Sequence, residues 1–218
     1  MRIDLDPDRV LALSYVPTRH RPAVEALWRL DAALGAVIAG GREPMLSRIK
    51  LVWWRDALDA LDGKPPPGEP VLQALAAQVL PRGVAGVELA KMEEGWSVLL
   101  SPDPLRPEEL DLYAAQRGGR LFRLAARILW DERPEIEAAG RAWALADLAR
   151  HSNAQDADAA IAALRKLPRP GRLPGPLRPL GMLGALARRD AEPERPRWEA
   201  QGSPARMWRM LRHRLTGA

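Results

Sequence analysis

The chain has 218 residues, of which 47% are hydrophobic and 28% charged, a composition that supplies a sizeable core and excludes a chain disordered throughout. It has no cysteine, which excludes disulfide bonds, thiolate metal sites, iron–sulfur clusters and cysteine nucleophiles. Its three scattered histidines do not form an HExxH-type metal site. The length favours one large globular domain over two small ones.

Charge is distributed unevenly along the chain. The net charge is +5, yet residues 164–218 alone carry 13 basic and 4 acidic side chains. Such a segment suits an anionic partner, namely lipid headgroups, nucleic acid, a diphosphate or an acidic protein; the alternative is a solvated arginine-rich tail. No apolar run approaches the ~20 residues of a membrane span, and the N-terminus lacks the apolar core of a signal peptide. We expect a cytoplasmic protein, with a peripheral position at a membrane as an alternative.

Helical periodicity dominates the sequence in chain order. Pro7 and Pro22 each stand where a helix begins, and Gly40-Gly41 ends the second helix. Further helices are predicted at residues 44–61, 71–80, 84–100, 107–130, 134–151, 154–167 and 180–188, with a last one after Ser203-Pro204. No segment alternates as a strand would. The fold class predicted is all-α, with about nine or ten helices.

Five prolines between residues 168 and 179 interrupt the helical pattern and indicate a loop or linker. We therefore expect residues 1–167 to form a helical core. Residues 168–218 are expected to form a Pro/Arg-rich loop and basic C-terminal helices that pack on, or extend, the same domain.

The predicted helix at 44–61 carries the densest polar signal. Asp56, Asp59 and Asp62 lie three residues apart, so they share roughly one face, and three carboxylates on one face can hold Mg²⁺. The alternative, a solvated acidic face, is the one we favour. The apolar residues expected on the inner side of this helix are Leu46, Ile49, Val52, Trp53, Ala57 and Leu61. Trp53 and Trp54 point in different directions, so one is expected in the core and the other at a pocket or between helices.

A second signal is Gly118-Gly119 inside a predicted helix. Each glycine costs about 1 kcal/mol relative to alanine, so a neighbouring helix or a ligand is expected to approach the backbone there. Arg120, Arg123 and Arg127 share one face nearby and could bind a diphosphate, or could simply be surface residues. His151 follows Asp147 at the i, i+4 spacing. That pair suits a metal or a shared proton, although a histidine held by the helix C-terminus is the reading we favour.

Five segments carry a resemblance to a known family. They read ALWRLDAALGAV at 26–37, IKLVWWRDALD at 49–59, PGEPVLQAL at 67–75, YAAQRGG at 113–119 and AGRAWALADLAR at 139–150. In order and spacing they resemble the squalene/phytoene synthase family over about residues 5–165. The resemblance implies the isoprenoid-synthase fold, an all-α bundle around a central apolar cavity. Residues 166–218 match this family only loosely.

The departures from the family pattern concern its metal sites. Active members hold Mg²⁺ and the diphosphate leaving group with two aspartate-rich segments. Where the first should fall this chain has Gly35-Ala36, with Asp31 a turn too early, and Ala32 replaces the family's arginine. The second reads Arg150-His151-Ser152-Asn153-Ala154, without its acids. The pattern resembles the divergent branch of the family that includes the mitochondrial complex I assembly factor.

The sequence therefore favours a divergent family member without catalysis, and we expect no catalytic residue and no cofactor. It would bind an isoprenoid or other apolar ligand, or act as a membrane-proximal assembly or scaffold protein. Candidate cavity- or diphosphate-lining residues are Trp53, Arg55, Tyr113, Arg117, Gly119 and Arg120. One alternative is an active Mg²⁺-dependent prenyltransferase that joins prenyl diphosphates, with Asp56 and Asp59 as metal ligands. The other is a peripheral membrane protein that uses its basic tail; nucleic acid is a weaker version of that idea because no nucleic-acid module is apparent.

Overall fold

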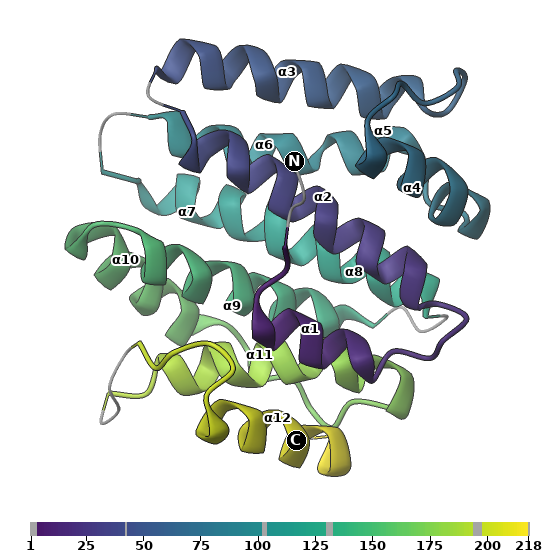
Figure 1. Ribbon diagram of the computed structural model, residues 1–218. Coiled ribbons are helices and arrows are strands. Elements are labelled where there is room, and N and C mark those ends of the chain that lie inside the picture. The colour runs from purple at the N-terminus through teal and green to yellow at the C-terminus, as the bar shows by residue number, and fades with distance from the viewer. Residues whose placement is uncertain (1–3, 42, 102–103, 130–132, 194–197, 218) are drawn as a thin grey trace.

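The computed structural model describes residues 4–41, 43–101, 104–129, 133–193 and 198–217, and within these residues it contains helices and no β-strand. The prediction of an all-α class is confirmed. Figure 1 shows the helices stacked in layers, with α3 at one edge of the molecule and α12 at the opposite edge.

The first four helices follow the predicted starts closely. They are α1 (Pro7–Ser14), α2 (Arg21–Ala39), α3 (Pro44–Ala60) and α4 (Pro70–Gln78). Proline stands in the first turn of each, where its missing N–H costs nothing. Asp6 caps α1 by accepting a hydrogen bond from the backbone N–H of Arg9 at 2.9 Å. Helix α2 packs against α3 and α4.

The inner face predicted for α3 is wrong at its N-terminal and central positions, whereas Leu61 is buried and Ala57 packs against the core, as predicted. The helix buries Ser47, Leu51, Trp54 and Leu58, while Leu46, Ile49 and Trp53 are exposed. Because α3 lies at the edge of the molecule, it contacts the bundle with one side only, and its second apolar side faces outward. Two apolar sides on one helix leave the sequence pattern unable to say which of them is buried.

The middle of the chain is more broken than the sequence predicts. Residues 84–100 form two short helices, α5 (Gly86–Ala90) and α6 (Met92–Ser97), and a 3-10 turn. Residues 107–129 form α7 (Pro107–Tyr113) and α8 (Arg120–Ile128), joined by a π-helical turn at Ala114–Gly119. Such wide turns in helices frequently mark functional sites.

The π-helical turn lies against α9 (Pro134–His151) at a close backbone crossing. A Cβ atom on Gly118 would collide with the carbonyl oxygen of Gly140, and a Cβ atom on Gly140 would collide with that of Gly118. The close approach expected from Gly118-Gly119 is thus made by a neighbouring helix. This crossing fixes the direction of α9, whose C-terminal half carries Asp147 toward the interior.

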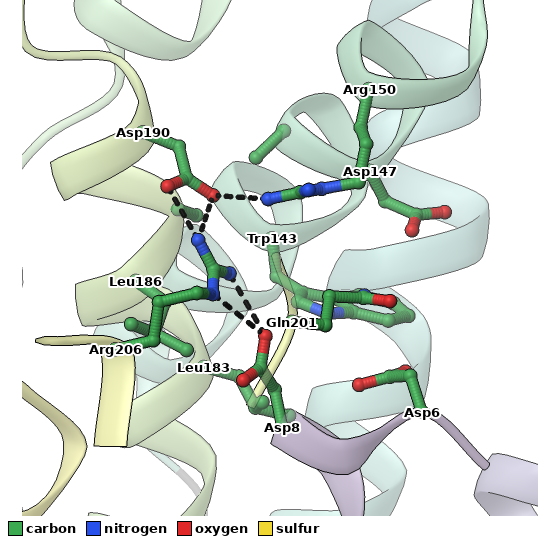
Figure 2. A pocket seen from close by; sticks show the side chains of 12 residues that line it. Asp6, Asp8, Trp143, Asp147, Arg150, Leu183, Leu186, Asp190, Gln201 and Arg206 are labelled. Carbon is green, nitrogen blue, oxygen red and sulfur yellow. Dashed lines mark hydrogen bonds and ion pairs between the residues drawn. The ribbon is translucent and has the colours of Figure 1, made fainter. Parts of the chain in front are cut away.

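The C-terminal segment folds back onto the bundle. Helix α10 (Ala154–Lys166) and α11 (Arg178–Asp190) pack on α9, and α12 (Pro204–Thr216) packs on α11 and α1. Figure 2 shows the buried guanidinium of Arg206 joining Asp190 to Asp8, with closest oxygens at 2.6 Å and 2.9 Å. Arg150 also reaches Asp190, at 3.3 Å. The space beside this network is about 30 Å³, which leaves room for water only.

Candidate functional site

A cavity of about 680 Å³ opens between α2, α6, α7 and the end of α9. This volume lies within the range of small-molecule sites. Besides Asp31 and Ile38, its wall on α2 consists of small residues, Ala32, Gly35, Ala36 and Ala39. These follow one another along one side of the helix because their spacing matches the helical repeat. Leu99, Leu105 and Leu148 add apolar surface opposite.

Arg117 lies at the floor of the cavity, where the π-helical turn positions it. Its Nε and Nη2 atoms donate to the two carboxylate oxygens of Asp31, at 2.9 Å and 3.1 Å. Its Nη1 atom lies 2.7 Å from Oδ2 of Asp147 and also donates to the hydroxyl of Tyr113. All three nitrogen atoms of the guanidinium therefore interact with neighbouring side chains. Arg117 and Asp31 are both fully buried, so these partners replace the water that each charge loses.

Aromatic rings enclose the same guanidinium. The centre of the Arg117 guanidinium lies 4.1 Å from the ring centroid of Trp96, 4.7 Å from that of Trp143 and 5.4 Å from that of Tyr113. Cation–π attraction at these distances stabilises a desolvated charge. The indole N–H of Trp96 is buried and has no hydrogen-bond partner within the described residues.

Arg9 provides a second cation at this site. Its Nη1 atom lies 3.1 Å from Oδ2 of Asp31, and its Nε atom lies 2.5 Å from Oδ2 of Asp6. Its guanidinium also stacks 5.1 Å from the ring centroid of Trp143. Asp31 thus accepts hydrogen bonds from two arginines that come from α1 and from the π-helical turn.

The electrostatic environment holds these ion pairs in their charged forms. Burial alone would lower the pKa of Arg117, but the charge of Asp31, with smaller contributions from Tyr113 and Asp147, outweighs burial and raises it. Burial alone would raise the pKa of Asp147, but the charges of Arg117 and Arg9 outweigh burial and lower it. Burial raises the pKa of Tyr113, so its hydroxyl stays protonated.

The titratable lining of the cavity is acidic on balance. Four carboxylates contribute, from Asp4, Asp31, Asp147 and Asp156, against the two guanidinium groups of Arg9 and Arg117, a formal net charge of −2 with His151 neutral. Asp156 accepts hydrogen bonds from the backbone N–H of Leu105 at 3.1 Å and from the Asn153 amide at 2.8 Å. A lining of this charge repels an anionic ligand group.

These residues do not fit the Mg²⁺ site that the family resemblance implies. Mg²⁺ takes several oxygen ligands in octahedral geometry. Both oxygens of Asp31 already accept guanidinium hydrogen bonds, and the other α2 positions that line the cavity are alanine, glycine and isoleucine, none of which can bind a metal ion through its side chain. Across the described part of the chain, no three His, Asp or Glu side chains are grouped so that they could hold a metal ion.

Of the candidate residues taken from the sequence, Tyr113 and Arg117 line the cavity. Gly119 instead packs toward Glu137 and Arg141 of α9. Arg120 donates to the side chain of Gln116 at 2.6 Å. Of the arginines grouped with Arg120, Arg123 pairs with Glu137 at 3.3 Å, and Arg127 pairs with Glu88 at 2.8 Å.

The other candidates lie on α3, away from the cavity. Trp53 is 47% exposed, while Trp54 is in the core beneath it. Arg55 and Asp56 form an exposed ion pair at 2.9 Å, and Asp59 is also exposed. Asp62 accepts hydrogen bonds from the backbone N–H groups of Gly86 and Val87, at 2.6 Å and 3.0 Å, and so stabilises the start of α5.

Arg9, Trp96 and Trp143 belong to the site although the sequence analysis did not single them out. The sequence indicated Asp31 only as an aspartate one turn before the expected metal motif, and Asp147 only as a partner of His151 in a candidate metal-binding pair. A usable signal existed, because both are charged residues among the apolar positions of a buried helix face, where charges require partners. His151 is exposed at the end of α9, with its Nδ1 atom 2.9 Å from the carbonyl oxygen of Asp147.

Comparison with known proteins identifies the family. The squalene/phytoene synthase family model matches residues 4–169. Comparison with curated proteins gives no match, nor does comparison with solved structures. Because the matched segment covers most of the chain and includes both cavity-lining helices α2 and α9, the chain belongs to the squalene/phytoene synthase family.

Proposed function

We propose that this protein is a non-catalytic member of its family that binds an uncharged, apolar, isoprenoid-like ligand in the central cavity. The observation that carries the proposal is the ion pair of Arg117 with Asp31, because it occupies the carboxylate that faces the cavity from α2. Arginine side chains here neutralise carboxylates that would otherwise be available to metal ions. The cavity itself retains a volume of about 680 Å³.

The charge balance argues against a prenyl diphosphate as the ligand. A diphosphate needs cations to bind it. The Nε, Nη1 and Nη2 atoms of Arg117, however, already interact with Asp31, Asp147 or Tyr113. Breaking one side of a buried ion pair costs about 3–5 kcal/mol. A neutral ligand avoids this cost, and its chain would contact the alanine and leucine walls.

The active-prenyltransferase alternative is disfavoured by the positions of its proposed ligands. Asp56 and Asp59 lie on the exposed side of α3, with Asp56 paired to Arg55. The divergent branch of the family and its scaffold role stay predictions from the sequence. No described helix has both the length and the apolar character needed to span a bilayer.

Two assays test the proposed function. Purified protein incubated with farnesyl diphosphate and Mg²⁺ should release no pyrophosphate. Ala36→Phe, which fills the cavity from α2, should weaken binding of farnesol at least tenfold, whereas Ala162→Phe on the exposed side of α10 should leave it unchanged. Pyrophosphate release above a no-protein control, or equal farnesol binding by both variants, would contradict the proposal.

A further inference from the structure

Helix α12 carries apolar side chains on the side that faces away from the bundle. Trp208 is 69% exposed and Leu215 68% exposed, and Met207 is 45% exposed. Together with half-buried Leu211 they recur at the spacing of one helix face. The opposite face of α12 is the one that buries Arg206, Met210 and His213 against the bundle. The outward apolar face is therefore additional to the packing face.

Basic side chains border this apolar face. Arg212 is exposed, and Arg209 and Arg214 are half-buried. The helix contains no Asp or Glu. Arg214 stacks on the ring of Tyr15 at 5.7 Å, which places a partly exposed tyrosine beside the C-terminal end of the face. Aromatic and basic residues around an apolar stripe are typical of helices that lie in a membrane surface.

The structure also separates the arginines of the basic segment into two groups. Arg178 and Arg188 donate to backbone carbonyl groups, which include those of Leu215 and Leu167 at 3.0 Å. Arg189 pairs with Glu199, and Arg206 is buried between Asp8 and Asp190. Much of the positive charge of this segment thus stabilises the fold. Arg212, which is exposed beside the outward face of α12, is placed to meet an external anion.

We infer that α12 is an interfacial helix that docks this protein on an anionic lipid bilayer, with Trp208 and Leu215 inserted among the acyl chains. A groove of about 190 Å³ lies beside Trp208, and Arg212 is its exposed cation. The inference does not depend on what the cavity binds.

Charge selects the bilayer over other occupants of this face. A second copy docked through the same face would bring arginines against arginines, because a two-fold interface opposes like surfaces. Nucleic acid would meet the arginines but would leave Trp208 and Leu215 without an apolar environment. The exposed apolar face of α3 also has basic neighbours, Arg48 and Lys50, but Asp56 and Asp59 add negative charge to that helix, whereas α12 contains no acidic residue.

Vesicle flotation of the full-length protein tests the inference. The protein should float with vesicles of phosphatidylcholine mixed with phosphatidylserine, and much less with phosphatidylcholine alone. Added salt should release it. Trp208→Ser combined with Leu215→Ser should reduce binding at least tenfold, and Arg212→Gln should reduce it about fivefold, the fold-change for one basic side chain at an anionic surface.

The matched control is Ile49→Ser combined with Trp53→Ser, which removes two exposed apolar side chains from α3 and should leave vesicle binding unchanged. All four positions are exposed, so both double variants should fold, and circular dichroism checks this. Absence of wild-type flotation would overturn the inference. So would equal binding by the α12 double variant, loss of binding in the α3 double variant, or sedimentation showing that the α12 face joins two copies of the chain.

Discussion

Arg117 and Asp31 lie 86 residues apart in the sequence and form a two-point ion pair at the floor of the cavity, with N···O distances of 2.9 Å and 3.1 Å. Arg117 lies in the π-helical turn, and Asp31 lies on α2 among its buried apolar residues. The pair determines both the charge of the site and the class of ligand that we propose.

Removal of Arg117 should be strongly destabilising. Arg117→Met leaves the carboxylates of Asp31 and Asp147 buried with fewer partners, and loss of one member of a buried ion pair costs about 3–5 kcal/mol. Arg120→Met is the matched control, since Arg120 interacts with Gln116 at the bundle surface, and it should cost under about 1 kcal/mol. Urea unfolding followed by circular dichroism measures both. Equal midpoints for the two variants would show that the ion pair contributes little.

Stability should fall at acidic pH because of Asp147. The pKa of Asp147 is lower in the folded protein than its ordinary value. The carboxylate therefore stabilises the fold above its unfolded pKa of about 4, and this contribution is lost as the pH falls through the folded value. The difference in unfolding free energy between wild type and Asp147→Asn should shrink from pH 7 toward pH 3. A difference independent of pH would contradict this assignment.

The crossing of the π-helical turn with α9 predicts a strong effect of one methyl group. Gly118→Ala forces a Cβ atom into the carbonyl group of Gly140, and overpacking of this kind costs about 1–3 kcal/mol. Gly68→Ala places its Cβ atom in open space and serves as the control. Thermal unfolding should show a clearly lower Tm for Gly118→Ala alone.

The Arg206 network predicts how the C-terminal helix is attached. Burial alone would lower the pKa of Arg206, but its hydrogen bond with Asp190 and the charges of Asp190 and Asp8 outweigh burial and raise it. Arg206→Met should therefore cost about 3–5 kcal/mol, whereas Arg212→Met, at an exposed position, should be close to neutral. Limited proteolysis should cut the Arg206→Met protein faster near residue 200. Equal cleavage rates would exclude a role for Arg206 in holding α12.

Much of the fold can be predicted from the sequence because its helices carry local start and stop signals. Proline, capping residues and periodic apolar positions predict α9 at residues 134–151, as observed. The π-helical turn cannot be predicted in this way, because the contact between Gly118 and Gly140 that accompanies it joins distant parts of the chain. Local signals also leave α3 ambiguous, since it carries apolar side chains on two sides.

The candidate site was predictable only in part, for a related reason. Tyr113 and Arg117 could be selected because they lie in a segment that resembles the family. Asp56 and Asp59 drew attention through their regular spacing, yet spacing does not reveal whether a helix face is exposed. The pairing of Asp31 with Arg9 and Arg117 depends on three elements that meet only in the folded protein.

The central claim is that the cavity binds an uncharged ligand without metal. Calorimetric titration of the purified protein with farnesol and with a non-hydrolysable farnesyl diphosphate analogue, each with and without Mg²⁺, tests it most directly. The account predicts binding of farnesol that is independent of Mg²⁺, and much weaker binding of the diphosphate analogue under both conditions. Tight binding of the diphosphate analogue that requires Mg²⁺ would contradict the account, because it would demand a metal site that the paired carboxylates do not provide.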